Sequence, residues 1–315
     1  MLKLKSLILG AVAVALVGCA TQPEEKTYAQ RMVESHGLGD FYCYQDSLSH
    51  TGWDYVSGLV ANAVLKSWEQ YPEKQCYYDA VKAFADFSLN EDGTFIRSLK
   101  GTNALRPSNI DDLPAGNIYF TLYRTELAKG NTVDAERYKA AATMIRNKLK
   151  FDHSRIAEGL PGAGGFFHKA VYPNQMWLDG LFMGSPIYAQ WQYNFGEADA
   201  ADHEASWSDI AHQFKTIHHY TYNKELQLNY HAWTATPEDI NSFWAQQEGE
   251  YKGCSPEFWG RGMGWYFAAL VDVLEFMPKE HADYEAVVTI LNDVAAGLAR
   301  WQDAESGVWY QLLQH

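Results

Sequence analysis

The chain has 315 residues, a formal net charge of −14 and an aromatic content of 15%. The acidic balance argues against nucleic acid as a partner, because phosphate binding needs basic patches that this sequence lacks. It leaves small anionic ligands open, since a few local Arg and Lys residues bind a carboxylate whatever the global charge. The surplus of Trp and Tyr is typical of sugar-binding clefts, although large helical cores also absorb many aromatic residues.

The chain begins with a segment of the signal-peptide type. Lys3 and Lys5 precede an apolar run from Leu7 to Val17 that is too short to span a bilayer. The Leu-Val-Gly-Cys ending resembles a bacterial lipobox, in which Cys19 is lipidated and becomes the mature N-terminus. An uncleaved signal anchor is the alternative. Ala20, rather than Asp, follows the cysteine, which resembles lipoproteins of an outer membrane and predicts a place on its periplasmic face or at the cell surface.

The rest of the chain contains no obvious linker. Without a Pro/Ser-rich stretch, charge block or low-complexity tract, one large domain is the simpler interpretation. The predicted division is therefore a signal peptide at 1–18, a lipidated cysteine with a short tether at 19–26, and a single domain at 27–315.

Three cysteines remain beyond the lipobox, an odd number in an exported protein. At most one disulfide can form, and one thiol stays free. We pair Cys43 with Cys76 and leave Cys254 unpaired. No cysteine or histidine spacing suggests a metal site.

From Lys26 onward the sequence predicts one helix after another. Apolar residues recur at the i, i+3, i+4, i+7 spacing of amphipathic helices, whereas sustained strand alternation is rare. The best candidate strand, Gly307–Leu312, is short. Helices are predicted over Asp54–Gln70, Tyr77–Leu89, Ala115–Ala128, Thr132–Leu149, Gln175–Trp191, Ala198–Thr221, Trp265–Met277 and Ala282–Trp301.

Short and long connections alternate between these helices. The long ones, Leu89–Ala115, Phe151–Gln175 and Asn223–Trp265, are rich in Gly, Pro, His and Trp, as functional loops tend to be. If every second connection is long, the loops collect at one end of a ring of antiparallel helix pairs. The predicted fold is an all-α toroid with its cleft at that end; a solenoid is the alternative that periodicity leaves open.

Within the second long connection and the helix after it, Gly165–Tyr188 contains a single carboxylate, Asp179. It stands next to Gly180 at the head of an apolar run. Apolar surroundings desolvate a carboxylate and raise its pKa until it can hold a proton near neutrality. Asp179 is therefore the predicted general acid, with a raised pKa.

Other candidate residues have two interpretations each. Asp111 and Asp112 either cap a helix N-terminus or supply a partner carboxylate for Asp179. His168 and Lys169 are either a solvated surface pair or, within their loop of Gly and aromatic residues, ligands for an anion.

Arg261 lies among three glycines that allow close backbone approach. Its guanidinium, flanked by Trp259 and Trp265, could bind a carboxylate bidentately. A structural turn that leads into the next helix is the alternative. Taken alone, His231 is more readily a packed or hydrogen-bonded histidine than a catalytic one.

Two segments carry a resemblance to a known family. Trp177–Met183 followed by Pro186, and Phe258–Trp265 before an Ala/Leu-rich helix, resemble the unsaturated glycuronyl hydrolases of glycoside hydrolase family 105, related to family 88. Met263 departs from the family's frequent Asn. Further similar positions are, in chain order, Asn109–Asp111, His168–Lys169 and Gly307–Gln311.

The resemblance implies an (α/α)6 toroid and an enzyme that acts on the 4,5-unsaturated uronic acid at the non-reducing end of lyase-generated oligosaccharides, of pectic rhamnogalacturonan or ulvan type. In such an enzyme Asp179 protonates C4 of the double bond and then helps water to add at C5, with assistance from Asp111. No metal or organic cofactor is required. The substrate-binding residues it implies are His168, Lys169, Trp177, His231, Trp259, Arg261 and Trp265.

Two rival functions stay open. A non-catalytic glycan-binding surface lipoprotein would need only the aromatic cleft, and a conventional glycosidase or lyase on the same fold would need its own acid–base pair. Because family members continue with more helix after the segment that ends near His315, the expected toroid is incomplete at its C-terminus.

Overall fold

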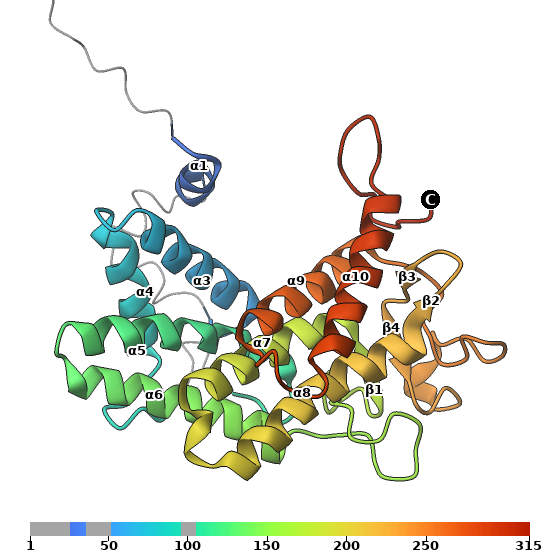
Figure 1. Ribbon diagram of the computed structural model, residues 1–315, viewed down its shortest axis with the longest axis horizontal. Helices are drawn as coiled ribbons and strands as arrows, with labels where there is room; N and C mark the ends of the chain where they lie inside the picture. The colour runs from blue at the N-terminus through green and yellow to red at the C-terminus, as the bar shows by residue number, and fades with distance from the viewer. Residues whose placement is uncertain (1–25, 36–51, 96–104) are drawn as a thin grey trace, which may run out of the picture.

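The computed structural model describes residues 26–35, 52–95 and 105–315 (Figure 1). Helices make up most of this part of the chain, and the strands are very short. The helices are α1 (Tyr28–Ser35), α3 (Tyr55–Gln70), α4 (Gln75–Phe87), α5 (Ile118–Ala128), α6 (Thr132–Asn147), α7 (Leu178–Phe195), α8 (Ala200–Thr221), α9 (Gly260–Phe276) and α10 (Tyr284–Arg300). The strands are β1 (Gln175–Trp177), β2 (Tyr222–Asn223), β3 (Leu228–Asn229) and β4 (Ala232–Thr234).

Short helical turns of other kinds fill several connections. They are the 3-10 turns η1 (Ile110–Asp112), η2 (Pro114–Asn117), η4 (Gly196–Ala198) and η5 (Ile240–Ser242), and the π-helical turn η3 (Lys148–Asp152). Within the described ranges, no helix combines the length and apolar character needed to cross a bilayer.

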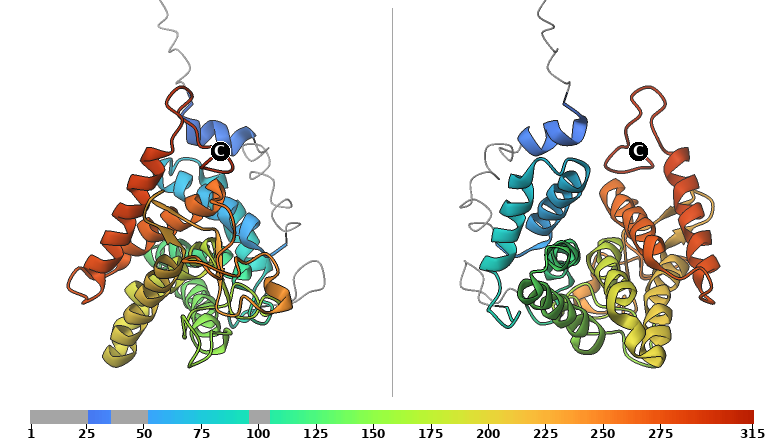
Figure 2. Two further views of the ribbon diagram at one scale, coloured as in Figure 1. Left: turned by 90° about the vertical axis from the view of Figure 1, so that its right-hand side faces the viewer. Right: turned by 60° about the vertical axis from the view of Figure 1, so that its left-hand side comes forward.

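Consecutive helices form antiparallel pairs, α3 with α4, α5 with α6, α7 with α8 and α9 with α10. The pairs follow one another along an arc, and the right-hand view of Figure 2 shows the α3–α4 pair and the α9–α10 pair at its two ends. The first helix of each pair contacts the first helix of the next, so α3, α5, α7 and α9 form the inner wall. The predicted ring of helix pairs is confirmed in this arrangement.

Local signals explain where the first pair begins and how tightly it packs. The side chain of Asp54 caps α3 by accepting the backbone N–H of Ser57 at 2.9 Å. Gly58 faces η2 so closely that an added Cβ would lie 2.4 Å from Cα of Ala115. A larger residue at position 58 would therefore push η2 and the loop before it away from the inner wall.

The predicted helix boundaries need two corrections. Gln175–Trp177 was expected to be the first turn of a helix but forms β1, because these residues pair with β4 and α7 begins only at Leu178. Helix α9 begins at Gly260, five residues before the predicted start, so Arg261 lies in its first turn. The expected strand at Gly307–Leu312 is reduced to a single antiparallel bridge between Trp259 and Leu312.

The cysteines agree with the expectation where the structure describes them. Cys254 is free and buried, and Cys76 is disulfide-bonded. Cys43 and the lipobox cysteine Cys19 lie outside the described residues. The pairing of Cys43 with Cys76 therefore stays a prediction.

Candidate active site

Asp179 and His231 meet because β1 and β4 pair. Trp177 on β1 lies opposite Ala232 on β4 in the antiparallel register, and the backbone N–H of Leu178 donates to the carbonyl of His231 at 2.9 Å. Asp179, the second residue of α7, and His231, the residue before β4, are then neighbours. Nε2 of His231 donates to Oδ2 of Asp179 at 2.7 Å, which makes a hydrogen-bonded acid–base pair out of residues 52 positions apart.

The predicted rise in the pKa of Asp179 is wrong for this structure. Burial does act in the expected direction, since only 15% of the side chain is exposed. The hydrogen bond from His231, followed by the charge of His231, outweighs burial and holds the pKa of Asp179 below its ordinary value. Asp179 is therefore a carboxylate in this structure, and it needs a partner to supply its proton.

Asp111 forms a second acid–base cluster. A backbone bridge between Asn109 and Lys169 brings η1 against the loop that precedes β1. Oδ2 of Asp111 lies 2.6 Å from Nζ of Lys169, and Oδ1 lies 3.4 Å from Nε2 of His168. Asp111 was expected as a helix cap or as a partner carboxylate for Asp179, whereas the structure pairs it with Lys169 and His168.

The adjacent Asp112 has a purely structural place. Neither aspartate caps a helix. Asp112 is fully buried and accepts the Nη2 of Arg106 at 2.5 Å and the backbone N–H of Arg106 at 2.7 Å. Burial raises the pKa of Asp112 against the effect of Arg106. This side chain anchors residues 106–112 and does not face the acid–base pairs.

A column of stacked rings separates the two clusters. The indole of Trp177 lies between His168, with ring centroids 4.4 Å apart, and Tyr172, with centroids 5.1 Å apart. Both faces of the indole are covered by protein rings, so Trp177, predicted as a substrate-binding residue, holds its neighbours in place in this structure. Burial lowers the pKa of His168 to about 4, which keeps the imidazole neutral at pH 7.

Arg261 extends the site beyond His231. Its guanidinium lies over Trp259 at 4.2 Å from the ring centroid, and the indole of Trp259 meets His231 edge to face at 4.8 Å. Gly262 makes this approach possible, because an added Cβ there would lie 2.9 Å from Cδ2 of His231. Within the described part of the chain, no carboxylate pairs with Arg261, which is exposed. The contacts run continuously from Asp179 through His231 and Trp259 to this free cation.

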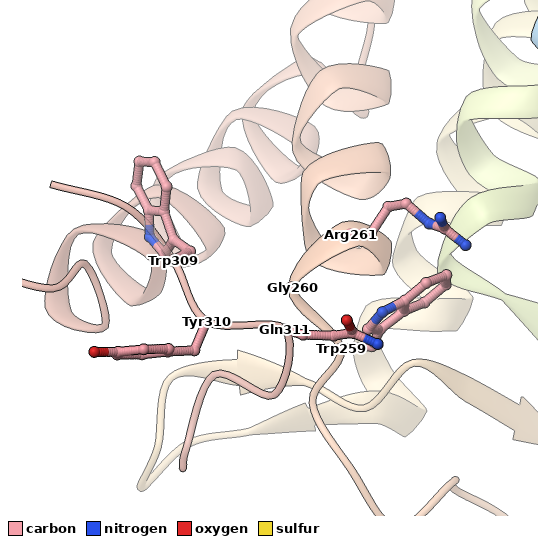
Figure 3. Close-up of a pocket in the computed structure, with 6 residues that line it drawn as sticks. All are labelled: Trp259, Gly260, Arg261, Trp309, Tyr310 and Gln311. Atoms are coloured by element: carbon pink, nitrogen blue, oxygen red, sulfur yellow. The ribbon is translucent and has the colours of Figure 1, made fainter. Parts of the chain in front are cut away.

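The Arg261 end of the site opens into a hollow of about 320 Å³. Segment 309–311 forms its other wall and is fixed there by the bond from the N–H of Gly260 to the carbonyl of Gln311, at 2.8 Å. Figure 3 shows Arg261 extending in the same direction as the indole of Trp259, while Tyr310 points to the opposite side. Trp309 and Tyr310 are both about half exposed.

Trp265 is the predicted binding residue with the weakest link to this site. Its ring packs against Phe182 at 4.6 Å and approaches Tyr55 edge to face at 6.5 Å. These contacts join α9 to α7 and α3. They give Trp265 a role in the inner wall and do not bring it to Asp179.

Sequence reasoning missed two residues that hold the site. Tyr172 supports the free face of Trp177. Gln175 is fully buried; its amide accepts from Nε1 of Trp177 at 3.1 Å and donates to the carbonyl of Asn241 at 2.9 Å. Their common partner Trp177 is close in the sequence, but the local pattern does not show that both side chains contact its indole.

No group of three or more metal-ligating side chains occurs within the described residues. The polar groups of the site are instead paired as acid with base. The chemistry that this arrangement offers is proton transfer next to an aromatic wall and a free guanidinium.

Comparison with known proteins assigns the class. The family model described as Glycosyl Hydrolase Family 88 matches residues 28–315. The chain therefore belongs to this family of glycosyl hydrolases.

Individual relatives are more distant. The chain is 24% identical over 261 residues to the unsaturated rhamnogalacturonyl hydrolase YesR of Bacillus subtilis, which covers 83% of this chain and 64% of YesR. It thus spans a little under two thirds of that relative's length. A short stretch of 54 residues, 17% of this chain and 13% of the relative, is 39% identical to an unsaturated 3S-rhamnoglycuronyl hydrolase of an Alteromonas species.

Solved structures confirm the toroid fold. A family 105 glycoside hydrolase from C. acetobutylicum superposes with a TM-score of 0.75 at 33% identity, over 92% of this chain and 70% of that one. The unsaturated glucuronyl hydrolase of Bacillus sp. GL1 is similar in fold alone, with a TM-score of 0.52 at 12% identity over 84% of this chain and 61% of that one. The (α/α)6 class predicted from the sequence is therefore correct.

Proposed function

We propose that this protein hydrolyses oligosaccharides that end in a 4,5-unsaturated uronic acid, by adding water across the C4–C5 double bond. The observation that carries the proposal is the 2.7 Å hydrogen bond between Asp179 and His231, connected through Trp259 to the unpaired Arg261. An enol ether needs a proton donor and a water activator on one face, together with a cation for its conjugated carboxylate. The pair and the arginine supply these groups.

The lowered pKa of Asp179 assigns His231 a larger part than the sequence suggested. An imidazole can both donate and accept a proton through its ring nitrogens. In the proposed step, the proton that protonated His231 shares with Asp179 passes through the carboxyl group to C4. Water then bonds to C5 and gives up its proton to the pair, which restores the starting state. The resulting hemiketal opens and releases the neighbouring sugar.

Arg261 is the proposed anchor for the uronate carboxylate. Of the three candidates from the sequence, Lys169 is occupied by Asp111 and His168 is neutral, since burial lowers its pKa to about 4. Arg261 has a free guanidinium at the edge of a hollow. A bidentate contact there would also orient the double bond, because the carboxylate is conjugated with it.

Asp111 has a supporting part in this proposal. Its contacts with Lys169 and His168 hold the loop that leads into β1 and so position Asp179. A conventional inverting glycosidase would need a second carboxyl group free to activate water. Asp111 is already paired with Lys169. This pairing favours hydration of the double bond by a single acid–base pair over the conventional inverting mechanism.

The relatives support a proposal for the substrate class. YesR acts on an unsaturated rhamnogalacturonyl group, and the short Alteromonas match is to an enzyme for an unsaturated 3S-rhamnoglycuronyl group. We propose a uronate linked to rhamnose, with pectic fragments ahead of ulvan fragments because the match to YesR covers far more of the chain.

The test is the ultraviolet absorbance of the conjugated double bond. Lyase-generated disaccharides from rhamnogalacturonan, ulvan and a glycosaminoglycan are incubated with the protein, and loss of absorbance with the first two is expected. Absorbance that persists with all three overturns the activity. New reducing ends from saturated polymer would indicate a conventional glycosidase, and binding without turnover would indicate a glycan-binding protein.

We also propose that Cys19 is lipidated and tethers the domain to an outer membrane. The support is the leader sequence alone, which lies outside the described residues. Expression with a labelled fatty acid should label the wild-type protein and leave the Cys19→Ser variant unlabelled. Label in both variants, or in neither, would contradict the anchor.

A further inference from the structure

A second hollow lies away from the candidate active site. It is bordered by the end of α8, the β2–β3 hairpin, the loop around Tyr251 and helix α10, and its volume is about 530 Å³. None of its lining residues belongs to the acid–base clusters or to the Arg261 hollow. The volume falls within the range of about 300–1,000 Å³ that is usual for small-molecule sites.

Rings dominate one part of the lining. Five of the nine lining residues are His or Tyr. The ring of Tyr222 stacks on His218 with centroids 4.4 Å apart. His218 is itself held by the amide of Asn229 at 3.4 Å and by Oδ2 of Asp293 at 3.5 Å. The stack is therefore a fixed aromatic surface, and Tyr222, which is only partly buried, can offer a sugar ring a flat apolar contact.

His218 contributes no positive charge to this surface. Burial lowers its pKa to about 4, with Asp293 acting in the opposite direction. The groups that face it from the neighbouring elements are Asp293 on α10, Tyr222 and Asn229 on the hairpin, and His219 beside it on α8. The platform is thus neutral at pH 7.

Charges of both signs complete the lining. The lining includes Lys224 and Lys252 together with Glu250 and Asp293, so the formal charges of these four residues cancel. In the part of the chain that the structure describes, neither lysine has a carboxylate partner. A site for phosphate or sulfate would need a surplus of cations. Sugar hydroxyls both donate and accept hydrogen bonds, so they match a lining of ammonium and carboxylate groups.

From this combination we propose that the hollow around Tyr222 binds a sugar unit of an oligosaccharide outside the catalytic centre. It would hold a saturated part of a glycan chain while the unsaturated end is processed elsewhere. The proposal does not depend on the hydrolase activity, because its ligand needs no double bond.

Calorimetric titration with saturated oligosaccharides of rhamnogalacturonan, ulvan and a neutral galactan tests this site. The wild-type protein is expected to bind at least one of them, and the Tyr222→Ala variant about tenfold more weakly. Lys224→Gln, an exposed change that leaves the ring stack intact, should weaken binding as well. Tyr193→Ala is the matched control, since Tyr193 is 60% exposed and lies in neither hollow.

Two further variants separate this proposal from the hydrolase. Tyr222→Ala should keep the KM and kcat for an unsaturated disaccharide, whereas Arg261→Gln should raise that KM and keep the affinity for the saturated ligand. The proposal is overturned by the absence of saturable binding of all three oligosaccharides. It is equally overturned by unchanged affinity in both Tyr222→Ala and Lys224→Gln, or by loss of the affinity in Arg261→Gln.

Discussion

Two carboxylates of this site face different bases, and the contrast separates their roles. Asp179 accepts a hydrogen bond from His231 at 2.7 Å, whereas Asp111 lies 2.6 Å from the ammonium of Lys169. An imidazole can donate a proton from one ring nitrogen and accept one at the other, whereas an ammonium group only donates hydrogen bonds. The Asp179–His231 pair can therefore move a proton during a reaction, whereas the Asp111–Lys169 pair holds the loop before β1 in place.

The largest effect is expected from Asp179→Asn. This change removes the group that carries the proton, so turnover of the unsaturated disaccharide should fall by about 100- to 10,000-fold. The measurement is the rate of absorbance loss, with circular dichroism to check the fold. Glu136→Gln is the control, because Glu136 is an exposed carboxylate. Turnover within twofold of wild type would remove Asp179 from the mechanism.

His231→Asn should lower the rate by about tenfold or more and also change its pH dependence. With the hydrogen bond and charge of His231 gone, burial dominates and the pKa of Asp179 rises above its present, lowered value. Without His231 the proton for C4 must sit on Asp179 itself, so the alkaline limb of kcat/KM against pH should move to the pKa of Asp179. An unshifted limb would show that His231 does not set the proton affinity of Asp179.

Arg261→Gln tests the difference between Arg261, which has no carboxylate partner among the described residues, and Lys169, which is paired with Asp111. Loss of a charge-assisted contact to the uronate should raise KM by about 10- to 100-fold with a smaller change in kcat. Lys169→Gln is the matched change, and it should raise KM less, because Lys169 already pairs with Asp111. Equal effects on KM would mean that the carboxylate binds between the two cations.

Asp111→Asn and Asp112→Asn compare two neighbours in the chain. Asp112 is fully buried with several donors around it, so its replacement should lower the free energy of unfolding by about 2 kcal/mol, discounted because Arg106 is half exposed. Asp111→Asn should cost activity with little loss of stability. Thermal unfolding and the absorbance assay on both variants measure this, and the reverse ranking would exchange the two roles.

The smallest effect concerns acid stability. Burial lowers the pKa of His153 from 6.5 to about 4, against a hydrogen bond from its ring to the carbonyl of Phe167. The contribution of the neutral His153 to the free energy of unfolding is complete above pH 6.5. It is lost as the pH falls towards 4, by at most roughly 3 kcal/mol. His153→Gln should flatten the stability profile in this window, whereas His315→Gln, at an exposed position, should not. A profile that keeps its slope would contradict the assignment.

The sequence predicted the elements whose cause is local. The apolar stripe of Asp54–Gln70 gave α3, and Asp54 proved to be its cap. Prediction from the sequence failed where a feature depends on residues far away in the chain. Gln175–Trp177 forms a strand because it pairs with β4, and the pKa of Asp179 is lowered by a histidine from another loop. An apolar neighbourhood can be recognised from adjacent residues, but the base that faces it cannot.

The pairing of β1 with β4 has a consequence for how this site comes into being. Neither Asp179 nor His231 meets its partner until two loops have closed and three residues on each side have found their register. Since non-local contacts form late and open early, the acid–base pair is expected to assemble after the helix hairpins. The amide of Leu178 donates to His231 across this junction, so its hydrogen exchange would report, residue by residue, how often the assembled site opens.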